Sequence, residues 1–134
     1  MSLLPFHVAM MSIAFVSMSA AISIAHWGKK AKWWLKAHKT LNIVAVSALL
    51  AGFALAVGMV QTSGGPHFRV DHAVIGSMTV LLSLCVIFLG FSIFRSKDKA
   101  KTASLRVAHR WSGRAALLMM IFAIVEGLDL AGII

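Results

Sequence analysis

Four apolar runs fill most of this chain, and each is long enough to cross a membrane as a helix. With 134 residues, of which 60% are hydrophobic and only 13% are charged, the chain is too apolar for an ordinary soluble domain. About 20 helical residues cross the ~30 Å hydrocarbon core of a bilayer. We therefore predict four membrane-spanning helices, at residues 4–26, 34–60, 66–94 and 105–131.

The short connections between these runs constrain the topology. Short links make neighbouring helices antiparallel, so we predict an all-α, up-down four-helix bundle in which residues 1–134 form one domain. Pro5 and Pro66 suit first-turn positions at the starts of the first and third helices. The first run lacks the basic segment and cleavage site of a secretory signal, and we expect it to be a mature helix.

The basic residues are distributed unevenly. Twelve of the 13 surround the first and third connections: Lys29, Lys30, Lys32, Lys36, Lys39, Arg95, Lys97, Lys99, Lys101, Arg106, Arg110 and Arg114. Loops 27–33 and 95–104 are therefore predicted to be cytoplasmic, with both termini outside. We expect a multi-pass protein of a bacterial-type inner membrane or plasma membrane, in contact with lipid. Because these charges flank apolar spans, a nucleic-acid partner is not expected.

One histidine lies near the start of each run: His7, His38, His72 and His109. Histidine is costly inside a membrane and marks functional sites there. Alternating helix direction places His7 and His72 at the outer depth, and His38 and His109 at the inner depth. The first and third helices of an up-down bundle are diagonal neighbours, as are the second and fourth. We therefore predict two pairs, His7–His72 and His38–His109, each able to supply both axial ligands of a haem iron.

The nature of the haem and the spacing of the sites follow from the same positions. Cys85 is a single cysteine in mid-span, and the chain has no Cys-x-x-Cys-His motif, so a haem here is non-covalent and of the b type. Each histidine lies about one turn inside the hydrocarbon, which predicts roughly 20 Å between the two irons. His26 and His67 are interpreted as polar residues at the membrane rims, although His67 has an alternative role as a proton gate.

Glycines accompany the histidines. The spacing His-x3-Gly-x13-Gly occurs twice, as His72–Gly76–Gly90 and as His109–Gly113–Gly127. Eighteen residues make five whole helical turns, so the second glycine lies on the histidine's face at the depth of the other site. Gly52 follows His38 by 14 residues and lies within about 40° of its face. We interpret these glycines as gaps for flat macrocycles; the alternative is ordinary small-residue packing of membrane helices.

Together these segments resemble the core of cytochrome b561, in the form often fused to DOMON domains, over nearly the whole chain. The most specific stretch is His109-Arg110-Trp111-Ser112-Gly113-Arg114, followed by Gly127-Leu128. Similar stretches are Asp71-His72-Ala73-Val74-Ile75-Gly76 with Leu89-Gly90, and Trp34 and His38 with Ala51-Gly52-Phe53-Ala54-Leu55. The first helix is least similar, with His7-Val8 where the family has His-Gly.

The resemblance implies two b haems on the same histidine pairs, and transmembrane electron transfer. Animal and plant members have six helices and use ascorbate, whereas this sequence shows four core helices. We therefore expect a quinol, or a soluble or membrane redox protein, as the partner of a transmembrane oxidoreductase. Arg69, Lys39, Arg110 and Arg114 adjoin the ligands and are predicted to bind haem propionates or an anionic donor; the alternative is that the inner cations only fix topology.

Two other functions compete with this interpretation. The chain could be a haem-bearing anchor subunit of a larger respiratory or reductase complex. It could also be a histidine-lined proton or metal transporter. The transporter is disfavoured because Glu126 and Asp129 lie near the outer end of the fourth helix and no carboxylate lies in mid-membrane. The oligomeric state is left open.

Overall fold

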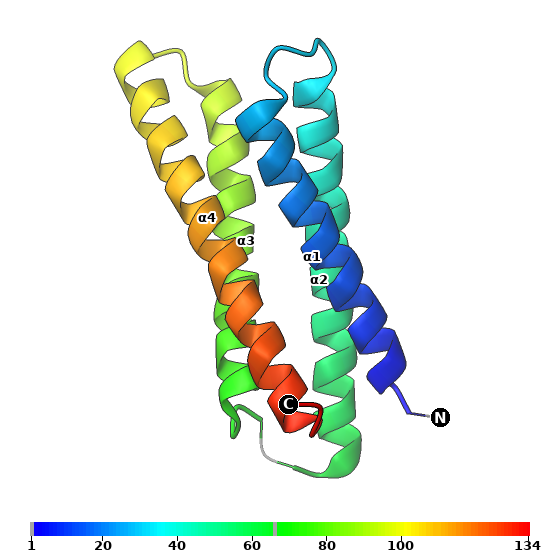
Figure 1. Cartoon of the computed structure of the whole chain (residues 1–134). Helices are drawn as coiled ribbons and strands as arrows, with labels where there is room; N and C mark the ends of the chain where they lie inside the picture. The colour runs from blue at the N-terminus through cyan, green and yellow to red at the C-terminus, as the bar shows by residue number, and fades with distance from the viewer. Residues whose placement is uncertain (1, 66) are drawn as a thin grey trace.

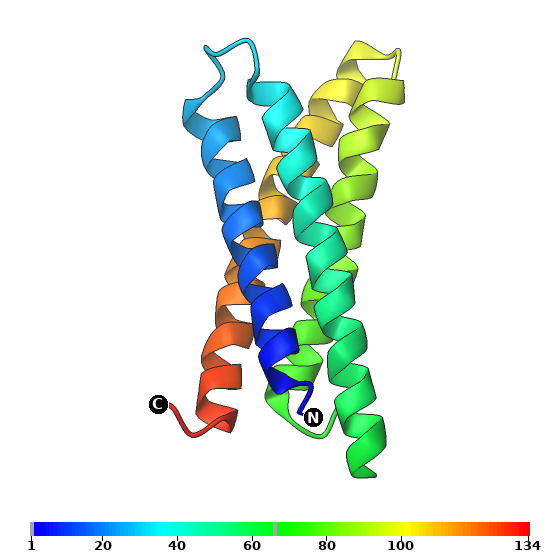
Figure 2. The ribbon, with the colours of Figure 1, turned by 90° about the vertical axis from the view of Figure 1, so that its right-hand side faces the viewer.

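The computed structural model describes residues 2–65 and 67–134 and shows four long helices (Figure 1). They are α1 (Leu4–Trp27), α2 (Trp34–Ser63), α3 (Asp71–Arg95) and α4 (Lys99–Leu130). No strand occurs among the described residues. The helices run alternately up and down, as Figures 1 and 2 show together. The predicted all-α bundle is confirmed.

Three of the described helices, α1, α2 and α3, are long and apolar enough to cross a membrane. The protein is therefore an integral membrane protein. α4 carries charges near both ends, with Arg110 and Arg114 on one side of its apolar centre and Glu126 and Asp129 on the other. It lies beside α3 along the bundle (Figure 1), and a membrane crossing by α4 stays a prediction.

Two helix starts differ from the predicted ones. α3 begins at Asp71 and not at residue 66, because Phe68 has a φ of 60° and Val70 is extended, and neither conformation continues a helix. Pro66 itself lies outside the described residues. α4 begins at Lys99 and not at residue 105, because the Asp98 carboxylate accepts hydrogen bonds from the backbone N–H groups of Ala100 (2.8 Å) and Lys101 (3.1 Å). The third connection is therefore much shorter than residues 95–104.

The bundle consists of two helical hairpins. α1 packs closely against α2, and α3 against α4, whereas the hairpins meet only lightly along α2–α3 and α1–α4. α1 and α3 are consequently diagonal neighbours, as are α2 and α4. We call the end with the α1–α2 and α3–α4 connections the loop end, and the end with both chain termini the termini end (Figure 1).

Each helix presents a stripe of buried residues at the same steps after its histidine. Seven residues after it lie Ala14, Ala45, Thr79 and Ala116, and eleven residues after it lie Met18, Leu49, Ser83 and Met120. Steps of seven and eleven residues are close to two and three whole turns, so these positions share the histidine's face. The small residues of the first layer allow close helix packing in a membrane. α3 alone among the four helices places hydroxyl side chains in both layers.

Candidate functional site

The four histidines form two facing pairs inside the bundle. The ring centres of His7 and His72 lie 6.1 Å apart near the termini end, with an angle of 80° between the ring planes. The ring centres of His38 and His109 also lie 6.1 Å apart, near the loop end, with an angle of 84°. Each pair joins diagonal helices, so the structure brings together the residues that were expected to pair.

Every one of these rings is fixed by a hydrogen bond from Nδ1 to a backbone carbonyl of the other helix in its hairpin. The acceptors are Gly52 for His7 (2.8 Å), Ala21 for His38 (2.9 Å), Ala123 for His72 (2.7 Å) and Val86 for His109 (2.9 Å). A carbonyl oxygen can only accept, so Nδ1 carries the proton in each neutral ring. The lone pair is then on Nε2, which is the arrangement found in metal-binding histidines.

The acceptor carbonyls share one spacing, which the glycine pattern of the sequence indicates only for Gly52. Ala21, Gly52, Val86 and Ala123 each lie 14 residues after the histidine of their own helix. Fourteen residues span about 21 Å of helix. In each hairpin, the histidine of one helix thus lies level with the residue 14 positions after the histidine of the other helix. This alignment, the register of the hairpin, fixes the axial separation of the two histidine pairs. The available signal was a small or β-branched residue at this step in all four runs.

Gly90 and Gly127 make room for histidine rings. A Cβ on Gly127 would lie 2.9 Å from Cε1 and 3.0 Å from Nδ1 of His72. A Cβ on Gly90 would lie 3.2 Å from Cε1 of His109. Histidine rings thus occupy the space at Gly90 and Gly127 that the glycine spacing predicts for a macrocycle. Each glycine lies one turn beyond the carbonyl that binds the same ring.

The other three glycines differ from these two and from one another. A Cβ on Gly52 would lie 2.9 Å from Cε of Met11, so Gly52 permits close approach of α1 and α2. A Cβ on Gly76 would meet no atom within 4 Å, and one on Gly113 would meet only Cγ1 of Val86, at 3.8 Å. Gly76 and Gly113 therefore leave open space one turn after His72 and His109.

The predicted rim residues are all exposed. Arg69 lines a pocket of about 270 Å³ beside His72, together with Val70, Asp71, Glu126, Asp129 and Leu130. At the loop end, Lys39 Nζ lies 3.8 Å from the centre of the Phe94 ring. The Arg114 guanidinium lies 5.1 Å from the centre of a Trp111 ring. Arg110 is exposed one residue after His109.

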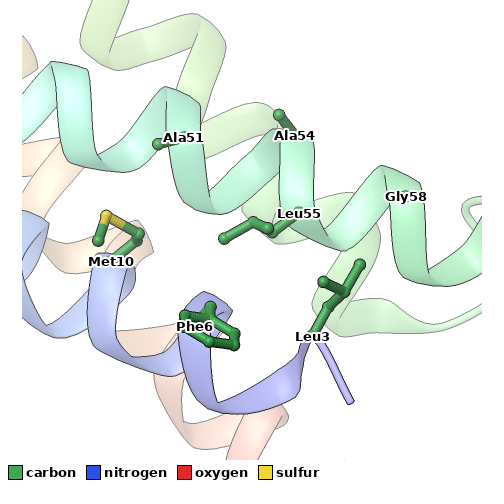
Figure 3. A pocket seen from close by; sticks show the side chains of 7 residues that line it. All are labelled: Leu3, Phe6, Met10, Ala51, Ala54, Leu55 and Gly58. Carbon is green, nitrogen blue, oxygen red and sulfur yellow. The ribbon is translucent and has the colours of Figure 1, made fainter. Parts of the chain in front are cut away.

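Two features lie apart from the histidine pairs. His26 and His67 are exposed, and their nearest aromatic neighbours are Trp27 and Phe68, not the paired histidines. A groove of about 480 Å³ lies between α1 and α2 and is lined by Leu3, Phe6, Met10, Ala51, Ala54, Leu55 and Gly58 (Figure 3). None of these lining residues has a polar side chain.

Comparison with known proteins assigns the family. A model of the eukaryotic cytochrome b561 family matches residues 6–133. The chain belongs to the cytochrome b561 family. Membership implies haem b, location in a membrane and haem-based transmembrane electron transfer. No curated protein and no solved structure matches the chain.

Proposed function

We propose that this cytochrome b561 carries two haem b groups, one between His7 and His72 and one between His38 and His109, and transfers electrons between them across the membrane. The observation that carries the proposal is the matched geometry of the two pairs. Both have ring centres 6.1 Å apart, and all four rings hydrogen-bond through Nδ1, which leaves the lone pair of each ring on Nε2; at His38, Nε2 also lies 3.4 Å from the Asn42 side-chain amide nitrogen.

The separation of the rings fits an iron ion between them. A bond from a metal to a histidine nitrogen is about 2 Å long, so the 6.1 Å between ring centres would leave room for one iron ion held by both histidines of a pair. The hydrogen bonds from Nδ1 to carbonyl oxygens support the same role, because they hold the tautomer and orient the ring. The open space at Gly76 and Gly113 suits a flat group beside His72 and His109.

The residues of the chain perform three tasks in this function. The histidines hold the two groups at fixed depths, and the 14-residue register keeps the depths about 21 Å apart. The buried side chains of Met18, Leu49 and Met120 exclude water from the layer between the pairs. Haem, when bound, supplies the one-electron chemistry at iron. The potential of each site then depends on ligand identity, hydrogen bonding and burial.

The rims provide the contacts with partners. We propose that the loop end is cytoplasmic, because the basic residues concentrate there. We expect exposed Lys39, Arg110 and Arg114 to neutralise propionates at that end, and Arg69 to do so at the other. Such a module takes electrons from a quinol or from a redox protein that docks at one rim.

The test is a haem count with a spectrum on the purified protein. A dithionite-minus-oxidised spectrum is expected to show a b-type α-band, with two haems per chain. His7→Ala and His38→Ala are each expected to remove one haem, and the matched control His26→Ala to remove none. Absence of the band in protein from haem-replete cells would refute the proposal and favour a histidine-lined transporter. One haem per chain would refute the two-site arrangement.

A further inference from the structure

Ser83 is a polar residue in a layer that is otherwise apolar. It lies at the step of eleven residues after His72, where the other helices carry Met18, Leu49 and Met120. Its side chain is only 1% exposed. Among the described residues, Ser83 Oγ is the one buried side-chain nitrogen or oxygen atom without a hydrogen-bond partner. An unpaired hydroxyl in such a place costs stability, so a partner inside the bundle is expected.

Other hydroxyls of α3 bond to their own helix. Thr79, one turn before Ser83 and equally buried, donates from Oγ1 to the Ile75 carbonyl at 2.8 Å. Ser77 and Ser92 donate in the same way to carbonyls four residues earlier, at 2.7 and 2.8 Å. This back-bonding is the usual arrangement of serine and threonine within helices. Ser83 does not use it, and its hydroxyl dipole is free to act on its surroundings.

Ser83 lies closer along α3 to one of the two histidine pairs than to the other. Val86, three residues further along α3, accepts the hydrogen bond from His109, and Gly90 faces the same ring. Along the helix axis, Ser83 is thus about 4.5 Å from Val86 and about 10.5 Å from Gly90, the two residues against the His109 ring, whereas it is about 16.5 Å from His72. Along α3, the unpaired hydroxyl therefore lies nearer to the level of the His38–His109 pair than to that of the His7–His72 pair, on the side toward the middle of the bundle.

We propose that the Ser83 hydroxyl raises the reduction potential of the haem held by His38 and His109. This inference rests on the proposed function. In a low-dielectric interior, a hydroxyl that directs its hydrogen toward a redox group stabilises the added electron, and no water screens the effect. Methionine and leucine at the equivalent steps supply no such dipole. Ser83 thereby favours electron flow toward the loop end of the bundle.

The test is a redox titration of purified holoprotein carrying Ser83→Ala. One of the two midpoint potentials is expected to fall while the other stays unchanged. The equilibrium constant for sharing one electron between the haems should change by about two- to tenfold, where tenfold corresponds to ~59 mV. The His7→Ala background retains the His38–His109 haem alone. In that background, Ser83→Ala is expected to lower the one remaining potential.

Two variants separate the unpaired hydroxyl from a general effect of polarity or packing. Ser83→Thr keeps the hydroxyl, so both midpoint potentials are expected to stay at the values of the unmodified protein. Thr79→Val removes an equally buried hydroxyl that is already bonded to its own helix, and should move neither potential. If Thr79→Val shifts the potential as much as Ser83→Ala does, the inference is wrong. If Ser83→Ala binds two haems with both potentials unaltered, this inference fails while the proposed function stands; failure to bind haem in the unmodified protein would remove the proposed function itself.

Discussion

Gly127→Ala should weaken the site formed by His7 and His72. The added Cβ would lie 2.9 Å from Cε1 of His72, whereas carbon atoms in good contact are about 3.5 Å or more apart. The ring must therefore retreat by about 0.6 Å, or α3 and α4 must separate. The Nδ1 hydrogen bond of 2.7 Å to Ala123 resists this retreat, because Ala123 and Gly127 lie on the same face of α4, one turn apart.

Gly90→Ala is the matched comparison at the other site. Its Cβ would lie 3.2 Å from Cε1 of His109, so the same contact requires a shift of about 0.3 Å. Overpacking of this kind costs about 1–3 kcal/mol. We expect the cost of Gly127→Ala to be near the upper end of this range and that of Gly90→Ala to be near the lower end. At 1.4 kcal/mol per factor of ten, haem affinity then falls about 100-fold in the first variant and about fivefold in the second.

Titration of each purified apoprotein with haem measures these affinities, with the b-type absorbance as the readout. At a haem concentration that fills both sites of the unmodified protein, Gly127→Ala should hold about one haem and Gly90→Ala about two. Circular dichroism checks that each variant retains its helices. Equal affinities for Gly127→Ala and the unmodified protein, or a larger loss in Gly90→Ala, would show that these glycines do not seat the histidine rings.

Three further substitutions test other parts of the structure. Gly76→Ala adds a Cβ that meets no protein atom within 4 Å, so the free energy of unfolding of the apoprotein, measured by thermal denaturation, should be unchanged or higher by up to ~1 kcal/mol. Its haem content should nevertheless fall, and normal haem loading would contradict a macrocycle beside Gly76. Arg69→Ala removes a cation beside His72 and should lower the potential of that haem alone; an unaltered potential and unaltered donor kinetics would exclude a role for Arg69. Asp98→Ala removes the N-cap of α4 and should cost about 1 kcal/mol in unfolding, with faster hydrogen exchange at Ala100 and Lys101; unchanged exchange would contradict the capping role.

The pairing of the histidines could be predicted from the sequence because four antiparallel helices with short links can pack in only a few arrangements. Four spans with short links alternate in direction, so the depth of each histidine follows from its place near the start of its run. Diagonal helices in such a bundle then leave one partner for each ring. The pairing of His7 with His72 and of His38 with His109, which the structure shows, can therefore be predicted without any knowledge of side-chain contacts.

The roles of individual glycines and carbonyls could not be obtained in this way. The acceptors at Ala21 and Val86 are backbone oxygens, which every residue possesses, so the small or β-branched residues at this step are only a weak signal for them. Gly90 lies 18 residues after His72 on the same helix, but the group that fills the space next to Gly90 is the His109 ring, which comes from the neighbouring helix. The early start of α4 was missed because its first turns are rich in lysine, although Asp98 supplies an ordinary N-cap. Ser83 attracts notice only when its missing partner is seen.

The separation of the two sites and the assembly of each site depend on different parts of the bundle. Each hairpin contributes one histidine to both pairs, and the 14-residue register within the hairpin sets the axial distance. The two hairpins share few contacts, so each histidine pair forms across the more sparsely packed boundary between them. A group that binds both halves together stabilises their association by RT ln(1 + L/Kd), where L is its free concentration and Kd its dissociation constant. Haem is therefore expected to strengthen the association of the hairpins while leaving the distance for electron transfer unchanged.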